Sequence, residues 1–332
     1  MAPGKGILAA DESSPTLDSR FMAAGISTGA DSRRAWREVL FGTPRLGSFI
    51  SGAILYDETI RQSATDARSF VQLLSDQQIL VGIKVDTGAK PLAHAPGESV
   101  TEGLDGLRQR LEEYRSMGAC FAKWRAVIRI DELKPSNQCL YANAHALARY
   151  AALCQEQEMV PIVEPEVLMD GSHDIERCAD VTATTLHWVF NALFEQNVMV
   201  DTIVLKPNMI TSGTGFANSP DSPELVAEHT LRCYLRHVPA STGGIALLSG
   251  GQSDAMATMN LNAINSRGDL PWRLTFSYGR ALQASAMQAW AGSGANVESA
   301  RAILLGLAEA NAAASEGRYR QLARAASTVL HS

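Results

Sequence analysis

A lysine at the end of an apolar run is the residue of this sequence best placed to do chemistry. Lys206 follows the apolar run 202–205 and precedes Pro207-Asn208. A buried lysine is costly unless it is paired or used. A neutral lysine amine attacks ketones and forms a Schiff base, whose protonated form withdraws electrons and lets an adjacent carbon–carbon bond break. Lys206 is therefore a candidate nucleophile. The alternative is a lysine that extends its ammonium group from a strand end into solvent.

Charged side chains also end four other apolar runs. Residues two apart on a strand point the same way, so each run presents its last polar side chains together. The carboxyl ends of several strands meet at one site in a parallel barrel. We therefore expect one charged site rather than scattered surface ion pairs. Its members are Asp11, Lys84, Asp86, Lys123, Arg125, Glu164, Glu166, Lys206 and Asn208.

The pKa of Lys206 must fall before its amine can act as a nucleophile, because the ordinary pKa of lysine is about 10.4. Burial and a neighbouring cation such as Lys123 both lower a lysine pKa. Loss of water to form the Schiff base needs a general acid, and Glu164 and Glu166 are the candidates. A salt bridge from either carboxylate to a lysine is the alternative, and the two roles are compatible. Pro165 lacks a backbone donor and predicts that the strand ends there.

Two glycine-containing turns predict a phosphate site. Ser249-Gly250-Gly251 follows the seventh apolar run, and Gly279-Arg280 follows the eighth. The loops after strands seven and eight are the usual phosphate site of α/β barrels, where backbone N–H groups and a helix N-terminus face the anion. Arg280 adds a bidentate donor. One such turn alone would indicate little, but two in consecutive loops favour phosphate binding.

Strand-like runs alternate with amphipathic segments along the chain, which predicts parallel βα units. Eight such runs favour an α/β fold of the TIM (β/α)8 type over an open doubly wound sheet. We expect one domain over residues 1–332, with an extra C-terminal helix at about 295–316 and a tail at about 318–332. Helical signals also cover 104–117 and the segment from Ser222 to about 237. The runs span residues 6–10, 52–57, 79–86, 120–125, 159–166, 201–206, 244–249 and 272–278.

Composition is typical of a globular protein and argues against some classes of binding partner. The 332 residues are 46% hydrophobic and 19% charged, and the net charge of −6 argues against a nucleic-acid or membrane-surface role. No apolar stretch is long enough to span a bilayer, and no signal-peptide core is visible at the N-terminus. The five cysteines are scattered, without CxxC or HExxH patterns, so we expect neither a disulfide framework nor a metal site. Reduced thiols in a cytoplasm are the simplest interpretation.

Seven stretches of the sequence together resemble the class I fructose-bisphosphate aldolases, the Schiff-base type that needs no metal. The resemblance extends from residue 3 to about residue 319. Stretches of this length, in this order, are highly specific. They are residues 4–13, 82–86, 121–125, 160–166, 205–209, 248–253 and 274–283.

The resemblance implies a role for each part of the charged site. Lys206 would form the Schiff base, Glu164 would be the principal acid/base, and Glu166 would support Lys206. Asp11 and Lys123 would position the hydroxyl groups and assist bond cleavage. The phosphate of the dihydroxyacetone half would contact Ser249, Gly250, Gly279 and Arg280. The other phosphate would lie near Ser13, Thr16, Lys84, Arg125 and Arg20.

The implied activity is the reversible cleavage of fructose 1,6-bisphosphate (EC 4.1.2.13) in glycolysis and gluconeogenesis. The resemblance also implies a cytoplasmic homotetramer that needs no cofactor and binds a sugar phosphate. Pro15, Thr16 and Ser19 differ from residues common in the family. A Schiff-base aldolase preferring fructose 1-phosphate or sedoheptulose 1,7-bisphosphate therefore stays open, as does a non-catalytic binding protein on this scaffold. The tail lacks the terminal tyrosine of the vertebrate enzymes, so we expect its gating to be absent or different.

Overall fold

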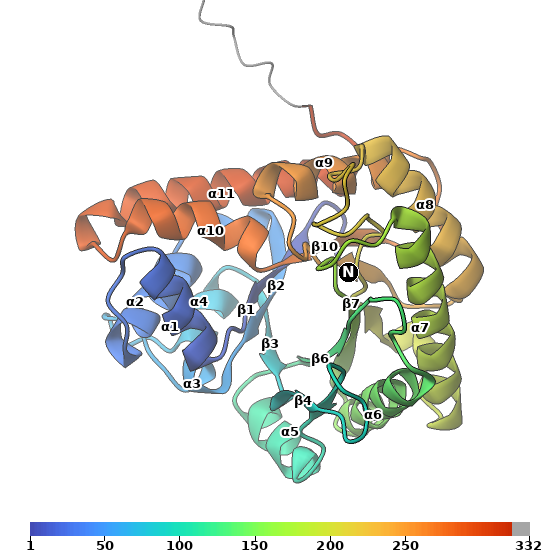
Figure 1. The fold of residues 1–332 in the computed structure, drawn as a ribbon. Helices are drawn as coiled ribbons and strands as arrows, with labels where there is room; N and C mark the ends of the chain where they lie inside the picture. The colour runs from blue at the N-terminus through green and yellow to red at the C-terminus, as the bar shows by residue number, and fades with distance from the viewer. Residues whose placement is uncertain (321–332) are drawn as a thin grey trace, which may run out of the picture.

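The computed structural model describes residues 1–320, in which eight parallel strands close into a barrel (Figure 1). Strands that follow one another in the chain are neighbours in the barrel, and β1 closes the ring against β10. This closure confirms the predicted TIM barrel and excludes the open sheet. In barrel order the strands are β1 (Gly6–Ala10), β2 (Ile50–Leu55), β3 (Leu80–Lys84), β6 (Phe121–Ile128), β7 (Val160–Val167), β8 (Val204–Leu205), β9 (Ile245–Leu247) and β10 (Leu274–Tyr278).

Helices surround the barrel (Figure 1). The predicted start of α8 is confirmed, since the Ser222 hydroxyl accepts a hydrogen bond from the Leu225 N–H. The predicted extra helix is α11, which packs on α2, α9 and α10. The helices are α1 (Ser14–Ala23), α2 (Ala30–Phe41), α3 (Asp57–Ile60), α4 (Phe70–Asp76), α5 (Leu107–Ser116), α6 (Asn137–Glu156), α7 (Ile175–Glu195), α8 (Pro223–His237), α9 (Asp254–Asn265), α10 (Arg280–Trp290) and α11 (Val297–Ala314). Short 3-10 turns cover Leu46–Ser48, Val200–Thr202 and Gly294–Asn296.

The single-domain organisation over residues 1–332 stays a prediction. The tail predicted at about 318–332, including its expected lack of gating, lies almost wholly outside the described residues. Among residues 1–320, no helix combines the length and the apolar character needed to cross a membrane.

Strand β7 runs past Pro165, so the prediction that it ends there is wrong. Its edge toward β8 carries the Val163 carbonyl, which accepts from the Lys206 N–H at 2.8 Å. Val167, four residues on, uses the same edge to donate to the Asn208 side chain at 3.2 Å. Pro165 lies between them on this edge, but β8 has already ended at Leu205. On its other edge β7 pairs with β6 as far as Val167, and the nitrogen of Pro165 does not face that edge, so the strand continues.

A two-stranded antiparallel hairpin interrupts the alternation after β3. It comprises β4 (Gly88–Pro91) and β5 (Ser99–Glu102). The sequence analysis did not anticipate it, because these short, largely polar strands carry no apolar alternation. The hairpin begins two residues after Asp86, and Gly88 and Ala89 contribute to the lining of the barrel mouth.

A small apolar cluster fills the barrel interior below the mouth. Its inward-facing side chains come from β1, β2, β6, β7 and β9. The Phe121 ring occupies the space against two glycines, and a Cβ added to Gly82 would lie 2.0 Å from it. Side chains alternate along a strand, so the next inward residue after Phe121 is Lys123 and the next after Ile162 is Glu164. The apolar cluster thus forms the floor of the barrel mouth, and the charged side chains lie directly above it.

Candidate active site

One pocket of about 800 Å³ opens at the carboxyl ends of the strands. Every residue predicted from the sequence as catalytic or substrate-binding lines it. Asn208, which was expected in the charged group, lies outside this pocket and accepts a hydrogen bond from Val167. The predicted residues in the lining are Asp11, Ser13, Thr16, Arg20, Lys84, Lys123, Arg125, Glu164, Glu166, Lys206, Ser249, Gly250, Gly279 and Arg280.

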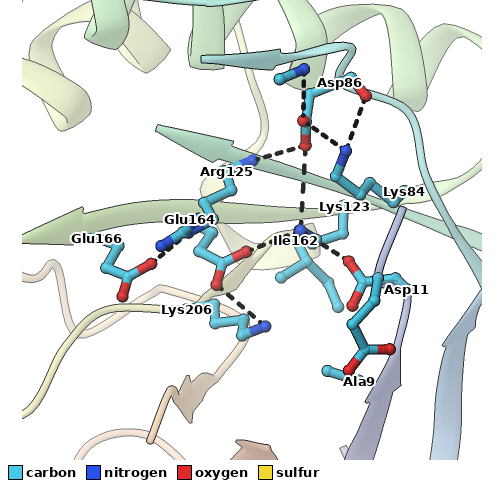
Figure 2. Close-up of polar contacts among 12 residues, drawn as sticks. Ala9, Asp11, Lys84, Asp86, Lys123, Arg125, Ile162, Glu164, Glu166 and Lys206 are labelled. Carbon is cyan, nitrogen blue, oxygen red and sulfur yellow. Dashed lines mark hydrogen bonds and ion pairs between the residues drawn. The ribbon is translucent and has the colours of Figure 1, made fainter. Parts of the chain in front are cut away.

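Lys206 directly follows β8, and its side chain is 5% exposed. Its Nζ lies 3.1 Å from Glu164 Oε1 (Figure 2). The other oxygen of the same carboxylate, Oε2, lies 3.3 Å from Lys123 Nζ. This buried Oε2 forms no hydrogen bond within residues 1–320. Glu164 therefore bridges the two lysines and keeps one oxygen available to a substrate group.

Lys123 is the more firmly held cation of the two. Besides Glu164, its Nζ contacts Asp11 at 2.8 Å and Asp86 at 4.0 Å (Figure 2). Burial alone would lower the pKa of Lys123, but the charges of Asp11, Glu164 and Asp86 outweigh burial and hold that pKa well above its usual value. Lys123 is a permanent cation at neutral pH.

Asp11 is the matching permanent anion. Burial alone would raise the pKa of Asp11. The charges of Lys123 and then Lys206 outweigh burial and hold the pKa of this carboxyl well below its usual range. A carboxylate with so low a pKa is a weak base, but it is a strong hydrogen-bond acceptor for a hydroxyl group.

Two further ion pairs stand beside this centre (Figure 2). Glu166 pairs with Arg125 across β7 and β6. Lys84 Nζ lies 2.9 Å from Asp86 Oδ1. The resemblance implied that Glu166 supports Lys206, yet the ion pair recorded for Glu166 is with the arginine. Among residues 1–320, Glu166 and Lys206 form no direct ion pair.

The two predicted phosphate turns lie together at the mouth. Arg280 donates to the Gly250 carbonyl at 2.6 Å, so the loops after β9 and β10 are joined. Gly250 has a φ of 56°, a left-handed conformation that glycine adopts without strain. Helix α10 begins at Arg280, and its free N–H groups follow Gly279. Two adjoining turns with an arginine and a helix N-terminus suit a phosphate.

A second polar group comes from the loop after β1 and the start of α1. The hydroxyl groups of Ser13 and Thr16 lie 2.9 Å apart. Arg20 lies one turn further along α1 and pairs with Glu12. The pocket therefore offers hydroxyl and guanidinium donors at a second place.

Three pocket residues were not assigned a role from the sequence. Asp86 joins Lys84 to the backbone of Arg125, whose N–H it accepts at 3.2 Å. Ser277 is 1% exposed, and its Oγ has no hydrogen-bond partner in the described part of the chain. Alternation had already placed Asp86 in the expected charged site without a specific role, and Ser277, two residues before Gly279, could have been found in the same way. Glu12 carried no comparable signal.

Comparison with known proteins decides the family. The model of the family described as fructose-bisphosphate aldolase class-I matches residues 1–331. The chain belongs to the class I fructose-bisphosphate aldolases. Among residues 1–320 of this family member, no group of three or more His, Cys, Asp or Glu side chains could hold a metal ion.

Relatives and a solved structure agree with this assignment. A probable fructose-bisphosphate aldolase class 1 of Xanthomonas campestris is 54% identical over 96% of either chain. Fructose-bisphosphate aldolase 4, cytosolic, of Arabidopsis thaliana is 49% identical over 99% of this chain and 84% of its own. The structure of fructose-bisphosphate aldolase from Plasmodium falciparum, solved with TRAP and a small-molecule inhibitor, superposes with a TM-score of 0.94 at 47% identity. It covers 96% of this chain and 92% of that one.

Proposed function

We propose that this aldolase cleaves fructose 1,6-bisphosphate reversibly into dihydroxyacetone phosphate and glyceraldehyde 3-phosphate through a Schiff base on Lys206. The observation that carries the proposal is the 3.1 Å contact between Lys206 Nζ and Glu164 Oε1. It lies in a pocket that also contains the joined turns at Gly250 and Arg280. An amine, an acid/base and a phosphate site are the parts that the reaction requires.

The first half of the reaction forms the Schiff base. Lys206 first passes a proton to Glu164, and its neutral amine then attacks the C2 carbonyl carbon and gives a carbinolamine. Glu164 then protonates the departing hydroxyl group, which leaves as water. Its oxygen that forms no hydrogen bond in the free site is suited to receive that hydroxyl group.

The second half breaks the carbon–carbon bond. Electrons of the C3–C4 bond move into the protonated imine while Glu164, now a carboxylate, takes the proton of the C4 hydroxyl group. Asp11 and Lys123 hold the hydroxyl groups in place, because both keep their charges throughout. After the aldehyde leaves, the enamine takes at C3 the proton that Glu164 received from the C4 hydroxyl group, which restores the carboxylate. Water then hydrolyses the imine and frees the amine.

Reductive trapping tests the proposal. Borohydride added with dihydroxyacetone phosphate should fix a stable adduct on the peptide that contains Lys206. An adduct on Lys84 or Lys123 instead, with Lys206 unmodified, would show that the nucleophile is assigned wrongly. Absence of any adduct together with absence of cleavage would favour the non-catalytic binding protein.

A substrate panel tests the preference among ketose phosphates. We propose that fructose 1,6-bisphosphate is cleaved with the highest kcat/KM, because the pocket holds donors at two separate places for two phosphates. Fructose 1-phosphate and sedoheptulose 1,7-bisphosphate are the comparison substrates. A higher kcat/KM for either would replace the proposed substrate with that one.

We further propose that the protein is a cytoplasmic homotetramer. The plant relative named above is called cytosolic. The surface exposes large apolar side chains, including Phe194 (82%), Tyr141 (57%) and Leu235 (55%), of the kind that interfaces cover. Light scattering should give a mass of about four times 35.6 kDa, and cell fractionation should place the protein in the soluble cytoplasmic fraction.

A further inference from the structure

Glu12 follows Asp11 in the chain, and its carboxylate joins three helices. Its Oε2 accepts from Arg37 Nη2 of α2 at 2.8 Å. Its Oε1 accepts from Gln283 Nε2 of α10 at 3.0 Å and pairs with Arg20 of α1. The Glu12 side chain is 6% exposed. Elements that are distant in sequence are therefore fixed to one buried carboxylate.

Gln283 connects this carboxylate to the phosphate turn. Its backbone N–H donates to the Gly279 carbonyl at 3.1 Å, and its side chain donates to the Ala9 carbonyl at 2.7 Å. A Cβ added to Gly279 would lie 3.8 Å from Glu12 Oε1. The carboxylate thus lies directly against the turn that presents Arg280.

Glu12 also holds the arginine of the second polar group. Arg20 lines the pocket with 28% of its side chain exposed. Arg37 is 1% exposed, and its Nε and Nη1 have no partner within residues 1–320, so its charge depends on Glu12. One carboxylate facing two guanidinium groups leaves a net positive charge, which attracts rather than repels a phosphate.

We propose that Glu12 is a positioning residue that fixes Arg20 relative to the Gly279–Arg280 turn and thereby selects ketoses with two phosphates over those with one. The inference rests on the proposed function, since it assigns Arg20 to the phosphate remote from the dihydroxyacetone half. Glu12 contacts no reacting atom. A rigid pair of anion sites gains binding energy from the second phosphate only when both phosphates fit at once.

Glu12→Gln tests the proposal, because it keeps the shape of the side chain and removes its charge. We expect KM for fructose 1,6-bisphosphate to rise by at least about tenfold, with kcat/KM for fructose 1-phosphate changed by less than about twofold. Arg20→Ala should produce the same selective loss. Combining the two should add nothing further, because Glu12 acts on the second phosphate through Arg20. Glu38→Gln, which removes the partner of Arg34 on α2 outside the pocket, is the matched control and should leave the substrate preference unchanged.

A second variant guards against misfolding, since Glu12→Gln leaves the Arg37 charge buried without its partner. Glu12→Gln with Arg37→Met removes both charges, and thermal unfolding checks that the fold is kept. The selective loss should persist in this variant. Equal losses for both substrates, or an unchanged preference in the folded double variant, would overturn the inference. If the wild-type protein cleaves neither substrate, it is the proposed function that fails.

Discussion

Glu164 contacts Lys206 through one oxygen, at 3.1 Å, and turns its other oxygen toward Lys123. The Glu164 carboxylate therefore lies within reach of Lys206, the proposed nucleophile, and also beside the positive charge of Lys123. Lys123 has two further carboxylate neighbours, Asp11 and Asp86, whereas the recorded ion pair of Lys206 is with Glu164. Within the described residues, Lys123 thus has three carboxylate neighbours within 4.0 Å and Lys206 has one.

Substitution of Lys206 should abolish the covalent intermediate. Lys206→Ala removes the amine, and Lys206→Arg replaces it with a guanidinium group that stays protonated. We expect neither variant to form an adduct with dihydroxyacetone phosphate and borohydride, as checked by peptide mass mapping. Lys90→Arg, at an exposed position of the β4–β5 hairpin, is the control and should trap like wild type. Trapping that survives in Lys206→Ala would move the nucleophile elsewhere.

Glu164→Gln should keep the fold but slow both formation of the imine and turnover. Loss of a general acid typically costs about 10²–10⁴-fold in rate. The measurement is the pre-steady-state rate of borohydride-trappable adduct. Imine formation at the wild-type rate would remove Glu164 from the dehydration step. Glu166→Gln is the matched comparison, and we expect a smaller effect on this rate because its recorded partner is Arg125.

Arg280→Ala should weaken substrate binding more than it slows the chemistry. A phosphate that does not react is bound about equally in the ground and transition states, so its loss appears in KM. A charge-assisted hydrogen bond contributes about 1.5–3 kcal/mol, which corresponds to a rise in KM of roughly tenfold to a hundredfold. Steady-state kinetics with fructose 1,6-bisphosphate measure it. An unchanged KM would exclude Arg280 from the phosphate site.

The charge of Asp11 should stabilise the fold fully above about pH 4 and progressively less as the pH falls below that value. Its pKa in the folded protein lies well below the ordinary 3.8, so the unfolded chain binds more protons between those two values. Stability from this group is complete above about 3.8 and is lost as the pH falls toward the folded pKa. Urea unfolding from pH 3 to pH 7 should therefore show a difference between wild type and Asp11→Asn that shrinks in acid. A difference that stays constant over this range would contradict the assigned charge.

The barrel and its charged centre could be predicted because both follow from alternation. Phe121 and Lys123 are two positions apart, as are Ile162 and Glu164, so each apolar side chain of the floor is followed on the same face by a charged one. Such signals are local and visible along one strand. The family resemblance added the roles, but the convergence on one pocket already followed from strand ends.

The features that were missed depend on distant partners. Glu12 is fixed by residues 8, 25 and 271 positions away, and no local pattern links them. We expected β7 to end at Pro165 because the sequence does not show which neighbouring strand the proline nitrogen faces. The β4–β5 hairpin lacks an apolar face, so its pairing depends on backbone bonds rather than on a readable pattern.

The apolar floor beneath the lysines has a consequence for the order of events. Phe121 and its neighbours close the barrel from below, so sugar, aldehyde and water must share the mouth above. The proposed Schiff base on Lys206 would hold the three-carbon ketone in the pocket until the imine is hydrolysed. In the proposed mechanism the aldehyde leaves first, and the water that releases the ketone enters through the same mouth. Because the barrel is closed at its floor, the proposed covalent bond to Lys206 sets the order in which the two products leave.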